Sequence, residues 1–96
     1  MIKLVALWSE PSDKDAFDAD YEATHRGLAE ALPKVTCTFS KAAAGPYYRV
    51  AELAWDSQDD MNAALGSPGG AELMGDAARL QGAFGNKVET LILNQI

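Results

Sequence analysis

Large side chains recur at helical spacing in residues 17–33, the segment FDADYEATHRGLAEALP. Successive residues of an α-helix lie about 100° apart around its axis, so five of these side chains fall within an arc of roughly 80°. They are Phe17, Tyr21, His25, Leu28 and Leu32. The pattern predicts an amphipathic helix, capped by Ser12 and ended by Pro33, that turns the chain's only histidine toward whatever the helix packs against. The opposite side is predicted to face solvent and carries Asp18, Glu22, Arg26 and Glu30.

Four segments are predicted to be strands, at residues 2–8, 34–41, 47–55 and 87–93. Residues 34–41 alternate strictly between apolar and polar side chains, which is typical of a half-buried strand at the edge of a sheet. The other three segments carry apolar side chains on both faces, and residues 2–8 are expected near the centre of the sheet.

Two serine residues predict where a second helical region begins. Ser57 and Asp60 resemble a capping box in which aspartate replaces the usual glutamate, and a short helix follows them. Ser67 precedes Pro68, and proline is favoured at the first position of a helix because its missing N–H costs nothing there. The apolar stripe of this last helix is formed by Leu73, Ala77, Leu80 and Phe84.

The predicted order of elements is β-α-β-β-α-β. Two right-handed β-α-β crossings produce an α+β fold of the ferredoxin-like type, in which a four-stranded antiparallel sheet carries two helices on one face. The helices can cover only one side of a sheet whose strands are largely apolar on both sides. Soluble monomers rarely expose so large an apolar surface, and a second copy packed sheet against sheet would cover it. We therefore expect a homodimer.

The composition is that of a single soluble domain over residues 1–96. A formal net charge of −6, with no basic cluster to offset it, argues against nucleic acid and against an anionic membrane surface as partners. No apolar run approaches the roughly 20 residues that span a bilayer. The single cysteine, Cys37, excludes an intrachain disulfide and fits a reducing compartment. The expected location is the cytoplasm.

A set of residues occurs in a characteristic order over nearly the whole length of the chain. The set comprises Phe17, Tyr21, His25, Leu28, Pro33, the strand at 47–55, Asp56-Ser57, Asp60-Met61, Ser67-Pro68-Gly69 and Phe84. With this ordered set the chain resembles the EthD family (ethyl tert-butyl ether degradation protein D) of the dimeric α/β-barrel superfamily. The resemblance implies a ferredoxin-like protomer and a dimer whose two sheets close into a barrel. It also implies a small apolar cavity between each sheet and its helices.

His25 is the candidate for proton transfer, because imidazole is the side chain best suited to move protons near neutral pH. The resemblance places it at the family's histidine position, and Tyr21, one turn away, is placed to hydrogen-bond the imidazole or a substrate oxygen. The alternative is a half-buried helical histidine satisfied by a backbone carbonyl. No carboxylate has an evident claim to orient it, because Asp18 is two turns away and the facing of Glu52 is not settled.

Five aromatic residues are candidates for the wall of a pocket that takes a flat apolar ligand, and the alternative for each is a place in the core. Tyr48 and Trp55 have opposite parity on their strand, so only one of them is expected to face the helices. The five are Trp8, Phe17, Tyr48, Trp55 and Phe84.

Metal and cofactor sites are not predicted. One histidine and one cysteine fall short of the three or four ligands that zinc needs, and Cys37 is interpreted as a small buried residue. The glycine-rich residues 66–70 lack the lysine of a phosphate-binding loop. Haem-degrading relatives take their haem ligand from a histidine in the second helical segment, where this chain has none.

The sequence is compatible with two functions. The first is a cofactor-free cyclase, isomerase or monooxygenase that acts on a small hydrophobic compound, aromatic or polyketide-like, with His25 as general acid/base. The second is a non-catalytic module that binds such a compound or supports a neighbouring enzyme of a catabolic pathway. The inward-facing pair of His25 and Tyr21 favours the first, and the lack of an orienting carboxylate favours the second.

Overall fold

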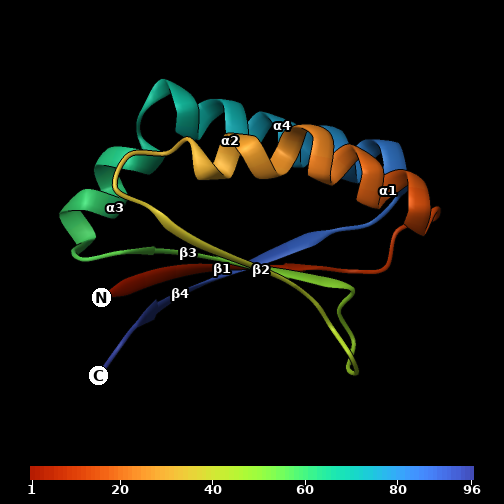
Figure 1. The fold of residues 1–96 in the computed structure, drawn as a ribbon, viewed down its shortest axis with the longest axis horizontal. Helices are drawn as coiled ribbons and strands as arrows, with labels where there is room; N and C mark the ends of the chain where they lie inside the picture. Colours follow the sequence, from red (N-terminus) through yellow and green to blue (C-terminus); the bar gives the residue numbers. More distant parts are fainter.

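A computed structural model describes all of residues 1–96 and contains one four-stranded sheet, covered on one face by a layer of helices (Figure 1). The strands lie in the order β2-β3-β1-β4, and every neighbouring pair is antiparallel. Their bounds are Ile2–Trp8 for β1, Thr36–Lys41 for β2, Arg49–Trp55 for β3 and Val88–Asn94 for β4. The predicted ferredoxin-like fold is confirmed, with β1 inside the sheet and β2 at its edge.

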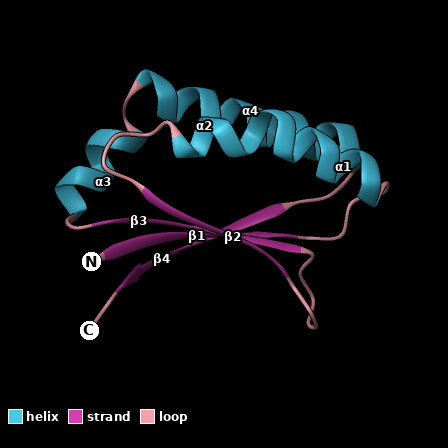
Figure 2. Cartoon of the chain, in the orientation of Figure 1, coloured by secondary structure: helices cyan, strands magenta, loops and turns pink.

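The helical layer contains one long helical segment and a second pair of helices (Figure 2). The long segment consists of α1 (Lys14–Asp20), a π-helical turn η1 (Tyr21–His25) and α2 (Arg26–Glu30). The pair consists of α3 (Gln58–Leu65) and α4 (Pro68–Phe84). None of these helices is long and apolar enough to cross a membrane.

The serine caps of α3 and α4 form as predicted, but the cap of α1 is one residue later than expected. Ser57 accepts a hydrogen bond from the backbone N–H of Asp60, and Ser67 accepts one from Gly70. For α1 the cap is Asp13, whose carboxylate accepts from the N–H of Ala16 at 3.1 Å. Aspartate and serine cap equally well, so the sequence did not distinguish Ser12 from Asp13.

The π-helical turn shifts which side chains face the sheet. The backbone N–H of Arg26 bonds to the carbonyl of Tyr21, five residues earlier, so this turn holds one residue more than an α-helical turn. Buried residues therefore follow each other at steps of four, from Tyr21 through His25 to Ala29. Leu28 packs against the core cluster but is only half-buried, and Ala29 takes the fully buried position. The wide turn keeps both Tyr21 and His25 directed at the sheet.

The polar side of the first helix is not wholly in solvent, contrary to the prediction. Arg49 extends from the helix-facing side of β3 and is only 4% exposed. It donates to Asp18 at 3.3 Å and to Glu22 at 2.6 Å. A buried guanidinium requires such acceptors, because an unpaired buried charge is costly. The two carboxylates are therefore part of the contact between helix and sheet, while Arg26 and Glu30 pair at the surface.

The second face of the sheet is uncovered in the single chain and carries apolar side chains. The register places Val5 beside Leu91, and Lys3 beside Leu93, on this face. Leu91 is 49% exposed and Leu93 is 46% exposed. The loop between β2 and β3 and the C-terminal end both extend on this side of the sheet (Figure 1). The uncovered apolar surface on which the dimer prediction rests is present.

Candidate functional site

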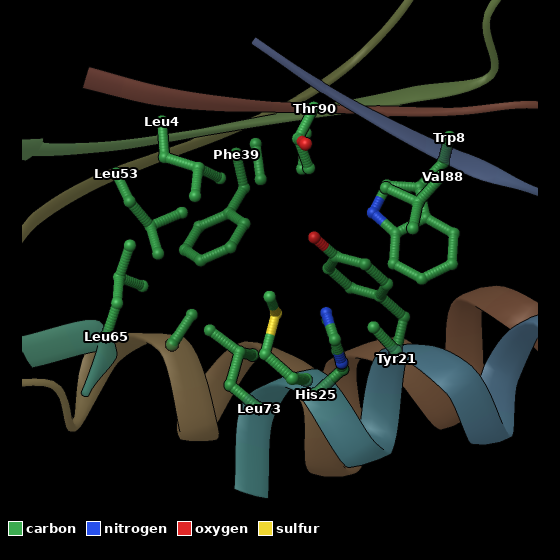
Figure 3. A pocket seen from close by; sticks show the side chains of 15 residues that line it. Leu4, Trp8, Tyr21, His25, Phe39, Leu53, Leu65, Leu73, Val88 and Thr90 are labelled. Carbon is green, nitrogen blue, oxygen red and sulfur yellow. The ribbon is translucent and has the colours of Figure 1, made fainter. Parts of the chain in front are cut away.

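A small apolar cavity lies between the sheet and the helical layer, with a volume of about 70 Å³ (Figure 3). Its wall consists of 15 residues, 13 of them hydrophobic. The sheet contributes Leu4, Ala6, Trp8, Phe39, Ala51, Leu53, Val88 and Thr90. The helices contribute Tyr21, His25, Ala29, Leu65, Leu73, Met74 and Ala77.

The wall of the cavity reaches the protein surface at α4 and β4. Only two of its wall residues are exposed, Met74 on α4 and Thr90 on the edge strand β4. Met74 is 61% exposed, and its unbranched side chain can change rotamer at little cost.

His25 forms a dyad with a carboxylate from another helix. Its Nδ1 lies 2.8 Å from Oδ2 of Asp76 on α4, and both side chains are less than a tenth exposed. A carboxylate only accepts hydrogen bonds, so Nδ1–H is the donor and the lone pair of the neutral ring is on Nε2. Figure 3 shows one ring nitrogen of His25 directed into the cavity. The arrangement therefore presents a base to an apolar space.

The protonation state of His25 suits that role. Burial lowers the pKa of His25 below its ordinary value of 6.5, and the hydrogen bond and charge of Asp76 oppose this shift only in part. The imidazole is thus neutral at pH 7. A proton taken up at Nε2 during a reaction would be stabilised by the carboxylate on the other side of the ring.

A network of charged groups holds Asp76 in place. Arg79 donates to Asp76 at 2.7 Å and forms a bidentate pair with Asp20 of α1, at 2.8 and 2.7 Å. Burial raises the pKa of Asp76, but hydrogen bonds from Arg79 and His25 outweigh it, so this pKa lies below its ordinary value. Asp76 is therefore ionised at neutral pH. The network also ties α1 to α4.

Tyr21 lies beside the dyad and does not bond to the imidazole. Its ring centroid is 4.9 Å from that of His25, and its hydroxyl points into the cavity (Figure 3). The guanidinium of Arg49 covers the ring at 4.0 Å from its centroid. Burial raises the pKa of Tyr21 to about 12, so the hydroxyl keeps its proton and can donate it in a hydrogen bond.

Of the five aromatic residues predicted as ligand contacts, Trp8 lines the cavity and the other four lie outside its wall. Phe17 and Phe84 pack against each other at 5.4 Å in the core beside Trp8. Trp55 lies in the larger core cluster, where its Nε1 donates to the carbonyl of Pro33 at 3.0 Å.

The prediction that only one of Tyr48 and Trp55 faces the helices was wrong. Its hydroxyl donates to Asp18 of α1 at 2.6 Å, so Tyr48 and Trp55 both reach the helical layer. The reason is that β3 begins at Arg49. Tyr48 therefore precedes the regular strand, and the alternation of side chains does not apply to it.

Asp76 is the candidate site residue that the sequence interpretation missed. Asp76 follows Leu73 by three residues and precedes Leu80 by four, which places it on the buried face of α4. A carboxylate within an apolar helical stripe is a signal of a paired or functional group. That signal was available from the spacing alone.

The side chains that could bind a metal ion do not cluster in this structure. No three side chains of histidine, cysteine, aspartate or glutamate lie close enough together to hold one. Cys37 is on the helix-facing side of β2, and burial raises the pKa of its thiol. It does not line the cavity.

Comparison with known proteins gives similarity in structure alone. No family model matches the chain, and no curated protein matches it in sequence. An EthD family protein from Bacillus halodurans has 25% sequence identity and a TM-score of 0.89 over 100% of this chain and 99% of its own. HapK from Hahella chejuensis has 19% identity and a TM-score of 0.71, with coverage of 100% and 93%.

A third similar structure is SnoaB from Streptomyces nogalater, described as a cofactor-independent oxygenase. It has 16% identity and a TM-score of 0.71, with coverage of 99% of this chain and 92% of its own. At this identity SnoaB and HapK show the shared fold only. The Bacillus protein matches much more closely, from end to end, and the resemblance of this chain to the EthD family is confirmed.

Proposed function

We propose that this chain is the protomer of a homodimeric, cofactor-free enzyme that removes a proton from a small hydrophobic compound, aromatic or polyketide-like. The observation that carries the proposal is the 2.8 Å hydrogen bond between Nδ1 of His25 and Asp76. That bond leaves Nε2 as the one basic atom in an otherwise apolar cavity. The fold it shares with SnoaB, a cofactor-independent oxygenase, is in keeping with such chemistry.

The proposed step is general-base catalysis. Nε2 of His25 takes a proton from a carbon or hydroxyl that is activated by a neighbouring carbonyl or aromatic ring. The bonding electrons remain on the compound as an enolate or phenolate, and Asp76 stabilises the imidazolium. Cyclisation, isomerisation and oxygenation by O₂ can all begin from such an anion. Removal of water from the apolar cavity strengthens these electrostatic interactions.

The small size of the cavity supports a second candidate, a non-catalytic accessory module, because a cavity too small for a ligand favours a purely structural role. A cavity of about 150 Å³ lined by aliphatic and aromatic residues binds benzene, and this one has about 70 Å³. Compounds of benzene's size, cyclopentanone among them, therefore fit only after Met74 or a neighbour moves.

The homodimer is part of the proposal. The exposed Leu91 and Leu93 lie on the uncovered face of the sheet, and a second sheet packed on that face would bury them. Because the cavity lies on the other side of the sheet, each protomer would hold a complete site.

The test is exchange of the α-protons of cyclopentanone for deuterium in D₂O, followed by NMR. We expect the wild type to accelerate exchange, His25→Gln to abolish the acceleration and Asp76→Asn to reduce it by about 10²- to 10⁴-fold. Asp18→Asn is the matched control, because Asp18 is also held by cations but lies away from the cavity. A wild type that binds the ketone and leaves the exchange rate at the buffer value would favour the accessory module.

A further inference from the structure

Trp8 carries a polar atom that the fold leaves without a partner. The residue is only 1% exposed, and its indole Nε1 is fully buried with no hydrogen-bond acceptor in the chain. Such an orphaned donor is uncommon, because a buried N–H without an acceptor costs free energy. The other buried tryptophan, Trp55, does have an acceptor, the carbonyl of Pro33. Of these two tryptophans, the one without an acceptor is therefore the one in the wall of the cavity.

Three side chains bring polar atoms to the same part of that wall. The ring centroid of Trp8 lies 6.0 Å from that of Tyr21 and 5.4 Å from that of His25, and the latter two are 4.9 Å apart. Figure 3 shows the Tyr21 hydroxyl and the Trp8 nitrogen on the cavity side of their rings. Two N–H or O–H donors thus lie beside one basic nitrogen, and the rest of the wall is nearly all hydrocarbon.

We infer that Trp8 Nε1–H and Tyr21 Oη–H form a binding site for one oxygen atom of the ligand, and that the ligand is an apolar ketone or phenol whose acidic proton faces His25. This inference rests on the proposed function and assigns its substrate class. An apolar wall recognises the hydrocarbon part of such a compound, and the two donors recognise its oxygen.

The same pair has a role in the proposed step. When the C–H bond next to a ketone carbonyl breaks, the proton goes to Nε2 of His25 and the electron pair moves onto the oxygen. Two fixed donors around that oxygen stabilise the enolate more than the neutral ketone, because the negative charge develops there. Since burial holds the pKa of Tyr21 at about 12, its hydroxyl is a donor at the start of the reaction and not an anion that would repel the enolate.

The inference is tested by comparing cyclopentanone with cyclopentane, which has the same ring and no oxygen. Binding of each to the wild type, Tyr21→Phe and Trp8→Phe is measured by NMR titration. Loss of one donor is expected to weaken cyclopentanone binding about 2- to 10-fold and to leave cyclopentane within twofold. Tyr48→Phe and Trp55→Phe are the matched controls, because each removes the same group at a position outside the cavity.

The infrared carbonyl stretch of bound cyclopentanone gives a second, spectroscopic readout. We expect it at lower frequency than in an alkane solvent, and closer to the alkane value in Tyr21→Phe, which keeps the ring and its packing. Equal losses for ketone and hydrocarbon in both variants, an alkane-like stretch in the wild type, or no binding of the ketone would each overturn the inference.

The outcomes separate this inference from the proposed function. Ketone binding that depends on Trp8 and Tyr21, without His25-dependent proton exchange, supports the oxygen site and contradicts the general base. Proton exchange that depends on His25 but is unchanged in Tyr21→Phe and Trp8→Phe supports His25 as the general base and contradicts the oxygen site.

Discussion

Removal of the Asp76 carboxylate should destabilise the protein strongly, through its bond to a buried imidazole. In Asp76→Ala the Nδ1–H of His25, a residue that is 6% exposed, loses its acceptor at 2.8 Å and gains none. A hydrogen bond to a charged group contributes about 1.5–3 kcal/mol, and a buried donor left unpaired costs about 1–3 kcal/mol. We expect the free energy of unfolding to fall by about 2–3 kcal/mol.

For a domain of this length, each 1 kcal/mol changes the melting temperature by about 4–8 °C, so the expected decrease is roughly 8–24 °C. The contribution of Arg79 to this loss is small, because its side chain is 45% exposed and can be hydrated. Nearly all of the effect should therefore depend on the presence of His25.

A double-mutant cycle isolates that dependence. Asp76→Ala, His25→Ala and the double variant are unfolded in urea, with the fluorescence of the two tryptophans as the signal. The expected coupling free energy between the two residues is about 1.5–3 kcal/mol. A second cycle on Glu10 and Lys14, an exposed pair 3.1 Å apart, should give the small value typical of surface pairs. If the two cycles give the same coupling, the buried hydrogen bond is not a stabilising interaction and the dyad geometry is wrong.

Three more predictions concern His25, two glycines of α4 and the uncovered face of the sheet. Because burial lowers the pKa of His25 in the fold, the unfolded chain binds more protons once the pH falls below about 6.5, so stability should be full above that pH and decline beneath it. Urea unfolding between pH 7.5 and 5 should show this slope in the wild type and a weaker one in His25→Gln. Gly70→Ala should lower the free energy of unfolding by about 1–3 kcal/mol, because an added Cβ would overlap the carbonyl of Leu65. Gly75→Ala has open space around it and should raise the free energy of unfolding by up to about 1 kcal/mol, measured by thermal unfolding. Leu91→Glu should convert the proposed dimer to monomers in analytical ultracentrifugation, and an unchanged sedimentation coefficient would place the interface elsewhere.

The sheet and its helices were predictable because each element carries its own periodic signal. Alternation identified β2 as an edge strand, and the spacing from Phe17 onward directed Tyr21 and His25 at the sheet. Leu28 packs against the core as predicted but is only half-buried, because a 3.6-residue period was extended through a segment that contains a π-helical turn. Steps of four among the aromatic residues were the available sign of that turn, because they exceed the α-helical period.

The dyad was harder to predict, because it depends on how two helices are placed relative to each other. Asp76 is 51 residues from His25 along the chain, and no local pattern states that the two positions face one another. What the sequence did contain was a carboxylate on the apolar stripe of α4. A buried charge must find a partner, so its presence there could have been matched with the one histidine directed at the same layer. The orphaned Trp8 nitrogen has no comparable sign in the sequence.

Because His25 and Asp76 belong to different helical segments, their hydrogen bond can form only while η1 and α4 are in contact. A compound that forced α4 away from η1 would stretch the 2.8 Å bond and release the histidine ring from its fixed tautomer. Under the proposed function, proton abstraction would then be limited to compounds small enough to leave the two helices in contact, and larger compounds would bind without reacting. The bidentate ion pair between Asp20 of α1 and Arg79 of α4 opposes such a separation of the helices. In the proposed reaction, the same contact between the two helices would both limit the size of the substrate and keep His25 in its basic tautomer.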